Sequence, residues 1–187
     1  MPSAPEHSFL TDLKFFDLLL EQFAGYEGEL TMAVAYLTQA AYDVDATRRE
    51  TLIRIARQKI KHADILRMIL LQIAQGRDAC SSTRPGLTEL VSYLIEQGMK
   101  IRRYEARAQA WPSAVDEEQP LIAPRYAGNP KNYLEADVAS EDKQIAVYRR
   151  LVSLTSDMTF SNALDHLRRA QKQHRLDLLG LLNAIDR

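Results

Sequence analysis

The stretch RQKIKHADILRMIL, residues 57–70, determines how this sequence can fold. At helical spacing it belongs to one apolar stripe that has only two polar members, Lys59 and His62. The stripe consists of Leu52, Ile55, Ala56, Lys59, His62, Ala63, Leu66, Ile69, Leu70 and Ile73. Because a charged side chain is costly to bury alone, these two residues indicate that the helix faces polar partners on other helices.

Helical periodicity also occupies most of the remaining chain, on both sides of a Pro-rich stretch. Helices are predicted over about 9–24, 28–43, 47–75, 86–108, 131–155 and 159–185. Residues 109–130 carry four prolines and no period, which is typical of a crossover or a functional arm. The pattern predicts an all-α fold in one domain, residues 1–187. We expect a ferritin-like four-helix bundle with a long crossover connection and extra N-terminal and middle helices.

Local signals predict where several of these helices begin and end. Gly25 and Gly28 are expected to end the first helix. Thr47 is the predicted N-cap of the third helix, with Glu50 completing a capping box. Ser156 or Asp157 is expected to cap the last helix.

Composition excludes several classes of function. The 24 basic and 25 acidic residues nearly cancel, so no basic surface for nucleic acid is expected. No stretch approaches the roughly 20 apolar residues of a membrane span, and the N-terminus does not resemble a signal peptide. Cys80 is the only cysteine, which excludes an intrachain disulfide. We therefore expect a cytoplasmic protein that binds neither nucleic acid nor membranes.

The other bundle helices also carry polar residues on their inward stripes. These residues are Glu29 on the second helix, Glu141 on the fifth, and Gln171 with His174 on the last. Any one of them alone would be explained as a solvated residue or a satisfied core histidine. Together with Lys59 and His62 they predict a shared polar site in the core, because buried charges need partners.

The spacing of these residues is similar to that of ferritin-like carboxylate proteins. Those proteins take one Glu from each of two helices and a Glu-x-x-His pair from each of two others. Here the two pairs read Lys59-x-x-His62 and Gln171-x-x-His174, so both of their glutamates are replaced.

Three segments resemble the metal-binding helices of manganese catalases and their short spore-coat relatives. They are LLLEQFAGYEGELTMAVAYLTQ (18–39), ADVASEDKQIAVYRRLVSLTSD (136–157) and LRRAQKQHRLDLL (167–179). The resemblance covers about residues 18–75 and 130–183. It implies that Glu29, His62, Glu141 and His174 match four of the family's five protein ligands to a dinuclear manganese centre.

The resemblance also implies that two positions critical for the chemistry have changed. Lys59 stands where the family has a glutamate that bridges both ions, and Gln171 stands where it has an acid-base glutamate. An amide does not exchange protons near neutral pH, and an ammonium has no lone pair for a metal. Lys59 could occupy the space of a metal between Glu29 and Glu141, turn away, or lose its proton beside a mononuclear site.

Three functions remain open at this point. The first is a ferritin-like protein with a degenerate site that holds one Mn or Fe ion or none rather than two and has a structural or assembly role or an unknown activity. The second is a working Mn- or Fe-dependent oxidoreductase that disproportionates peroxide or activates oxygen. In it Asp137, Asp64 or another nearby carboxylate replaces the missing bridge. Asp137 lies one turn before Glu141 and can point the same way, whereas Asp64 is two residues from His62 and faces elsewhere. The third is a small-molecule binding bundle with Tyr36 and Tyr148 lining the pocket. The resemblance further implies a homo-oligomer, with the Pro-rich segment as a candidate exchanged arm.

Overall fold

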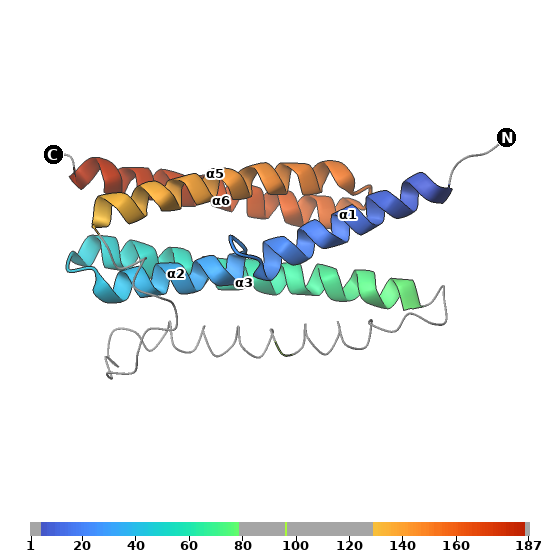
Figure 1. The fold of residues 1–187 in the computed structure, drawn as a ribbon, viewed down its shortest axis with the longest axis horizontal. Helices are drawn as coiled ribbons and strands as arrows, with labels where there is room; N and C mark the ends of the chain where they lie inside the picture. The colour runs from blue at the N-terminus through green and yellow to red at the C-terminus, as the bar shows by residue number, and fades with distance from the viewer. Residues whose placement is uncertain (1–4, 79–95, 97–128, 186–187) are drawn as a thin grey trace.

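The computed structural model describes residues 5–78, 96 and 129–185, and all regular secondary structure in these ranges is α-helical. The elements are α1 (Pro5–Ala24), α2 (Glu29–Tyr42), α3 (Ala46–Asp78), α5 (Pro130–Leu154) and α6 (Met158–Ile185). Helices α2 and α3 form one pair and α5 and α6 another, while α1 packs obliquely against both (Figure 1). The predicted all-α, ferritin-like fold is confirmed.

The long crossover predicted between the two pairs agrees with where the described helices end. Helix α3 ends at one end of the bundle and α5 begins at the other (Figure 1). The predicted helix 86–108 and the Pro-rich segment 109–130 lie almost entirely outside the described residues.

Two predicted helix boundaries are wrong. The side chain of Asp45, not Thr47, caps α3, since its Oδ1 accepts a 2.8 Å hydrogen bond from the backbone N–H of Arg48. Thr47 and Glu50 are exposed, and no capping box between them is observed. Helix α3 also continues through Gly76 instead of ending near residue 75, because a single glycine weakens a helix without breaking it. Asp157 caps α6 as expected, through Thr159 and Phe160.

The turn between α1 and α2 depends on two glycines. A Cβ atom at Gly25 would lie 2.4 Å from the backbone oxygen of Glu21, and one at Gly28 would lie 2.8 Å from the same oxygen. Neither backbone position leaves room for a side chain. The tight turn makes Gly28 the N-cap of α2 and sets Glu29 as its first residue. The glycines therefore determine where Glu29 enters the bundle.

The core runs between the two helix pairs and is mostly aliphatic, as the stripe on α3 predicts. Every member of that stripe is buried except Ile73, which is half-buried. Helix α2 is buried around its whole circumference from Met32 to Ala40, more than its predicted single face. None of the helices in residues 5–78 and 129–185 is long and apolar enough to cross a membrane.

Candidate functional site

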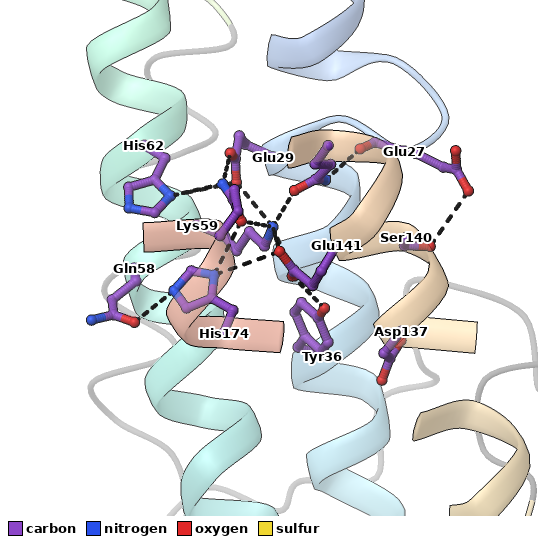
Figure 2. A network of polar contacts seen from close by, with 12 residues as sticks. Glu27, Glu29, Tyr36, Gln58, Lys59, His62, Asp137, Ser140, Glu141 and His174 are labelled. Carbon is purple, nitrogen blue, oxygen red and sulfur yellow. Dashed lines mark hydrogen bonds and ion pairs between the residues drawn. The ribbon is translucent and has the colours of Figure 1, made fainter. Parts of the chain in front are cut away.

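The ammonium group of Lys59 lies at the centre of the bundle, surrounded by oxygen atoms. The side chain is fully buried, and its Nζ lies 2.9 Å from Glu141 Oε1 and 3.5 Å from Glu29 Oε2. Nζ also donates to the side-chain oxygens of Gln144 and, at 2.6 Å, of Gln171. Its three hydrogens are therefore matched by three acceptors on Glu141, Gln144 and Gln171. Lys59 points into the core, between the two carboxylates (Figure 2).

Two glutamine side chains complete the surroundings of Lys59, each with its oxygen toward the ammonium. The amide nitrogen of Gln144 donates 2.6 Å to the backbone oxygen of Glu27, which orients its oxygen toward Lys59. The amide nitrogen of Gln171 donates to Glu29 Oε1. Gln171 thus presents an oxygen to the cation and an N–H to the anion. A glutamate at position 171 could donate a hydrogen bond to Glu29 only if it were protonated.

A tyrosine from the opposite pair of helices binds each carboxylate. Tyr36 of α2 donates 2.7 Å to Glu141 of α5, and Tyr148 of α5 donates 2.5 Å to Glu29 of α2. All four side chains are fully buried. Burial raises the pKa of both phenols well above 10, and the adjacent carboxylates raise it further, so both tyrosines stay neutral donors.

The two histidines close the site on the side of α3 and α6. Their rings stack with centroids 5.5 Å apart. His62 Nδ1 lies 3.7 Å from Glu29 Oε2, and His174 Nδ1 lies 3.8 Å from Glu141 Oε2. His174 Nδ1 is also 3.1 Å from the oxygen of Gln171, and its Nε2 lies 2.7 Å from the oxygen of Gln58. Each histidine is therefore paired with one carboxylate.

The electrostatics of the site favour ionised glutamates. Burial alone raises the pKa of Glu29, but the charges of Lys59 and His62, with hydrogen bonds from His62 and Tyr148, lower it from 4.5 to about 2. Burial also raises the pKa of Glu141, but the charges of Lys59 and His174, together with hydrogen bonds from His174 and Tyr36, lower it overall. Burial lowers the pKa of His174, which favours its neutral form. Glu29, Glu141 and Lys59 together carry one net negative charge.

The structure brings together the six residues singled out in the sequence. Glu29, Lys59, His62, Glu141, Gln171 and His174 form one contiguous network of hydrogen bonds and close polar contacts. The two carboxylates suggested as replacements for the bridging glutamate lie elsewhere. Asp64 is exposed and binds Arg67, while Asp137 is buried one turn away and binds Gln39.

Sequence reasoning missed Gln144 and the role of the two tyrosines. Gln144 follows Glu141 by three residues, so it shares the same helix face and could have been found by that spacing. Tyr36 follows Glu29 by seven residues, and Tyr148 follows Glu141 by seven. This repeated spacing is the signal that the two tyrosines, which the sequence predicts only as pocket residues, donate hydrogen bonds to the carboxylates.

Within residues 5–78 and 129–185, no group of three or more His, Cys, Asp or Glu side chains has the arrangement of a metal site. Figure 2 shows the ammonium of Lys59 among Glu29, His62, Glu141 and His174. The family model of manganese containing catalases matches residues 8–186. No individually curated protein gives a significant match.

Proposed function

The chain belongs to the manganese-containing catalase family, and from that premise we propose that its dinuclear metal site has been replaced by an internal ion pair. Lys59 supplies the positive charge that metal ions supply in the family, and the bundle acts as a structural or assembly protein. The observation that carries this proposal is the position of the Lys59 ammonium, fully buried and 2.9 and 3.5 Å from the two carboxylates.

Charge balance supports the proposal. Two divalent ions bring four positive charges, whereas Glu29, Glu141 and protonated Lys59 offer one net negative charge. Moreover, an ammonium within 4 Å of a divalent ion is repelled by it, and in a low-dielectric core that repulsion amounts to several kcal/mol. Filling the site with two ions would require Lys59 to leave or to lose its proton.

The amide of Gln171 supports the same conclusion from a different direction. Its oxygen faces Lys59 and its nitrogen faces Glu29, so it fits the space between a cation and an anion. A glutamate here would add a third negative charge beside Glu29. The changes at Lys59 and Gln171 are therefore complementary, and each makes the other less costly.

Metal analysis tests this proposal directly. Protein purified from medium supplemented with manganese and iron is expected to contain less than one equivalent of either metal per chain. The Lys59→Glu variant, which restores a carboxylate at the bridging position, is expected to take up more metal than the parent. Close to two equivalents in the parent protein would disprove the proposal.

A second function is favoured by the spacing of the Glu–His pairs. Two ligand atoms about 2.1 Å from one ion lie about 3–4 Å apart. The Glu29–His62 and Glu141–His174 pairs show separations of 3.7 and 3.8 Å. Moreover, Glu29 Oε2 has no hydrogen-bond partner among the described residues. A single Mn or Fe ion bound by such a pair, with Lys59 turned away or without its proton, would be the centre of an oxidoreductase that acts on peroxide or oxygen.

Oxygen release from hydrogen peroxide separates the two functions. The oxidoreductase requires turnover that is lost on chelation and restored by added metal. It also requires loss of turnover in Glu29→Gln or in Glu141→Gln, two variants that keep the shape of the side chain. The absence of turnover at saturating metal would leave the structural role as the supported function. Light scattering would test the homo-oligomer that we propose for either role.

A further inference from the structure

A second buried polar contact joins α2 and α5 next to the Lys59 site. The side-chain nitrogen of Gln39 donates 3.0 Å to Oδ1 of Asp137. Gln39 is 1% exposed and Asp137 is 3% exposed, so water does not replace missing hydrogen bonds from outside. Figure 2 shows Asp137 one turn along α5 from Glu141 and beyond Tyr36, with no contact to Lys59.

Both side chains have an oxygen atom with no partner. Gln39 Oε1 and Asp137 Oδ2 are buried, and neither has a hydrogen bond to any residue that the structure describes. If Asp137 is a carboxylate, both atoms are acceptors, and each costs free energy in a dry core. A proton on Asp137 Oδ2 would turn that atom into a donor. The acceptor Gln39 Oε1 belongs to the same amide group whose nitrogen already donates to Asp137 Oδ1. A single proton would thus provide a partner for both orphaned oxygens.

We propose that Asp137 is a neutral carboxylic acid in the folded protein, joined to Gln39 by two hydrogen bonds, and that this pair is a pH-sensitive contact between α5 and α2. In the protonated state the acid donates to the amide oxygen while the amide nitrogen donates to the acid. In the ionised state only the second bond remains. The contact between α2 and α5 is then weaker, and the core carries an additional negative charge.

The surrounding charges favour the protonated state. Burial raises the pKa of Asp137 most, and Glu141 on the same helix raises it further. The Gln39 hydrogen bond and the more distant Lys59 lower it, and the result is a pKa of about 7 instead of 3.8. From α2, Tyr36 is a neutral phenol. On α6, His174 faces Glu141.

Helix α1 also packs against α5, and the side chains described on it bring no charge toward Asp137. Its described charged residues, Lys14, Asp17 and Glu21, are exposed. The pH dependence then follows from linkage. The unfolded chain releases the Asp137 proton near its ordinary pKa of 3.8, while the folded chain keeps it until about pH 7. Folding stability contributed by this group therefore falls as the pH rises between these two values.

The Asp137→Asn variant tests the proposal, because asparagine can form the same two hydrogen bonds with Gln39 at every pH. We would measure urea unfolding of the parent and the variant between about pH 5 and pH 8. The folded-to-unfolded ratio of the parent should fall, relative to the variant, by up to about tenfold per pH unit over the lower part of this range. The exposed carboxylate in Asp64→Asn is the matched control and should leave the pH profile of the parent unchanged.

Infrared spectroscopy provides a readout that does not depend on the variant folding. The parent at about pH 6 should show the carbonyl stretch of a protonated carboxyl group. Glu29 and Glu141 do not produce it, since their pKa values are lowered. The band should disappear as the pH is raised above about 7, and it should be absent in Asp137→Asn. Parallel pH profiles of parent and variant, or a parent spectrum without this band at about pH 6, would overturn the proposal.

Discussion

Replacing Lys59 by methionine removes the central charge while keeping an unbranched side chain of similar length. The ammonium is the only cation within 4 Å of Glu141 among the described lysines and arginines, and it also pairs with Glu29. Its loss leaves two buried carboxylates without the ammonium that balances their charge. Breaking a buried ion pair from one side costs about 3–5 kcal/mol. For a chain of this size that corresponds to a decrease in melting temperature of roughly 6–20 °C.

Urea unfolding at neutral pH, followed by circular dichroism, measures this effect. Lys143→Met is the matched control, since Lys143 lies 2.8 Å from Glu27 but its side chain is 63% exposed. The control should change stability by about 1 kcal/mol or less. The loss in Lys59→Met should also shrink as the pH is lowered, because the stranded glutamates can then take up protons. A Lys59→Met protein as stable as the Lys143→Met control would refute the role of Lys59 as internal counter-ion.

Three further predictions concern the groups around Lys59. Tyr148→Phe removes a hydrogen bond to the ionised Glu29 and should destabilise the protein by about 1.5–3 kcal/mol in urea unfolding. Tyr42 is exposed, so the control Tyr42→Phe should have little effect. Equal losses of stability in the two variants would show that the contact with the carboxylate is unimportant. The pKa of Glu29 is lowered from 4.5 to about 2, so this carboxylate should contribute on the order of 3 kcal/mol of stability above about pH 4.5. That contribution should be lost in acid titrations as the pH falls toward 2. An acid transition that is unchanged in Glu29→Gln would contradict this prediction. Gly28→Ala should destabilise the turn, because its Cβ would lie 2.8 Å from a backbone oxygen. Gly180→Ala, whose Cβ would have no atom within 4 Å, should stabilise α6 by up to about 1 kcal/mol. A melting temperature that is higher for Gly28→Ala than for Gly180→Ala would show that the turn adapts to the added side chain.

The fold could be predicted because its main determinant is local. Long stretches of helical periodicity, few glycines and a single Pro-rich interruption specify helices of about the right length, and the buried stripe on α3 matches the predicted one. The errors at Thr47 and Gly76 arise from competition between nearby signals. Asp45 provides a better placed oxygen two residues before Thr47, and the packing of α3 overrides the weak helix-breaking tendency of one glycine.

The site could be predicted as a set of residues but not as a network. Inward-facing polar residues on four helices show that a shared site exists, because each would be costly alone. Periodicity does not reveal which hydrogen-bonding atom faces which partner. The hydrogen bond between Gln144 and the backbone of Glu27 joins residues more than 100 positions apart. Likewise, the cross-pairing of Tyr36 and Tyr148 with the opposite carboxylates depends on how the two helix pairs are docked.

The displacement of Asp137 from the Lys59 site illustrates the same limit. Its position one turn before Glu141 is compatible with a side chain that turns toward Lys59 or toward α2. Only the partner on α2 decides between these two orientations. Gln39 lies opposite Asp137, so the carboxyl group bonds there instead of turning toward Lys59. No feature of α5 alone contains that information.

An anomalous diffraction map at the manganese edge, from crystals grown with Mn²⁺, tests the central claim most directly. We predict side-chain density for Lys59 between Glu29 and Glu141 and no anomalous peak at coordination distance from both carboxylates. In the Lys59→Glu variant, a peak is expected at this position. Two anomalous peaks in the parent protein, with Lys59 turned away from the glutamates, would contradict the replacement of the metal site by an internal ion pair.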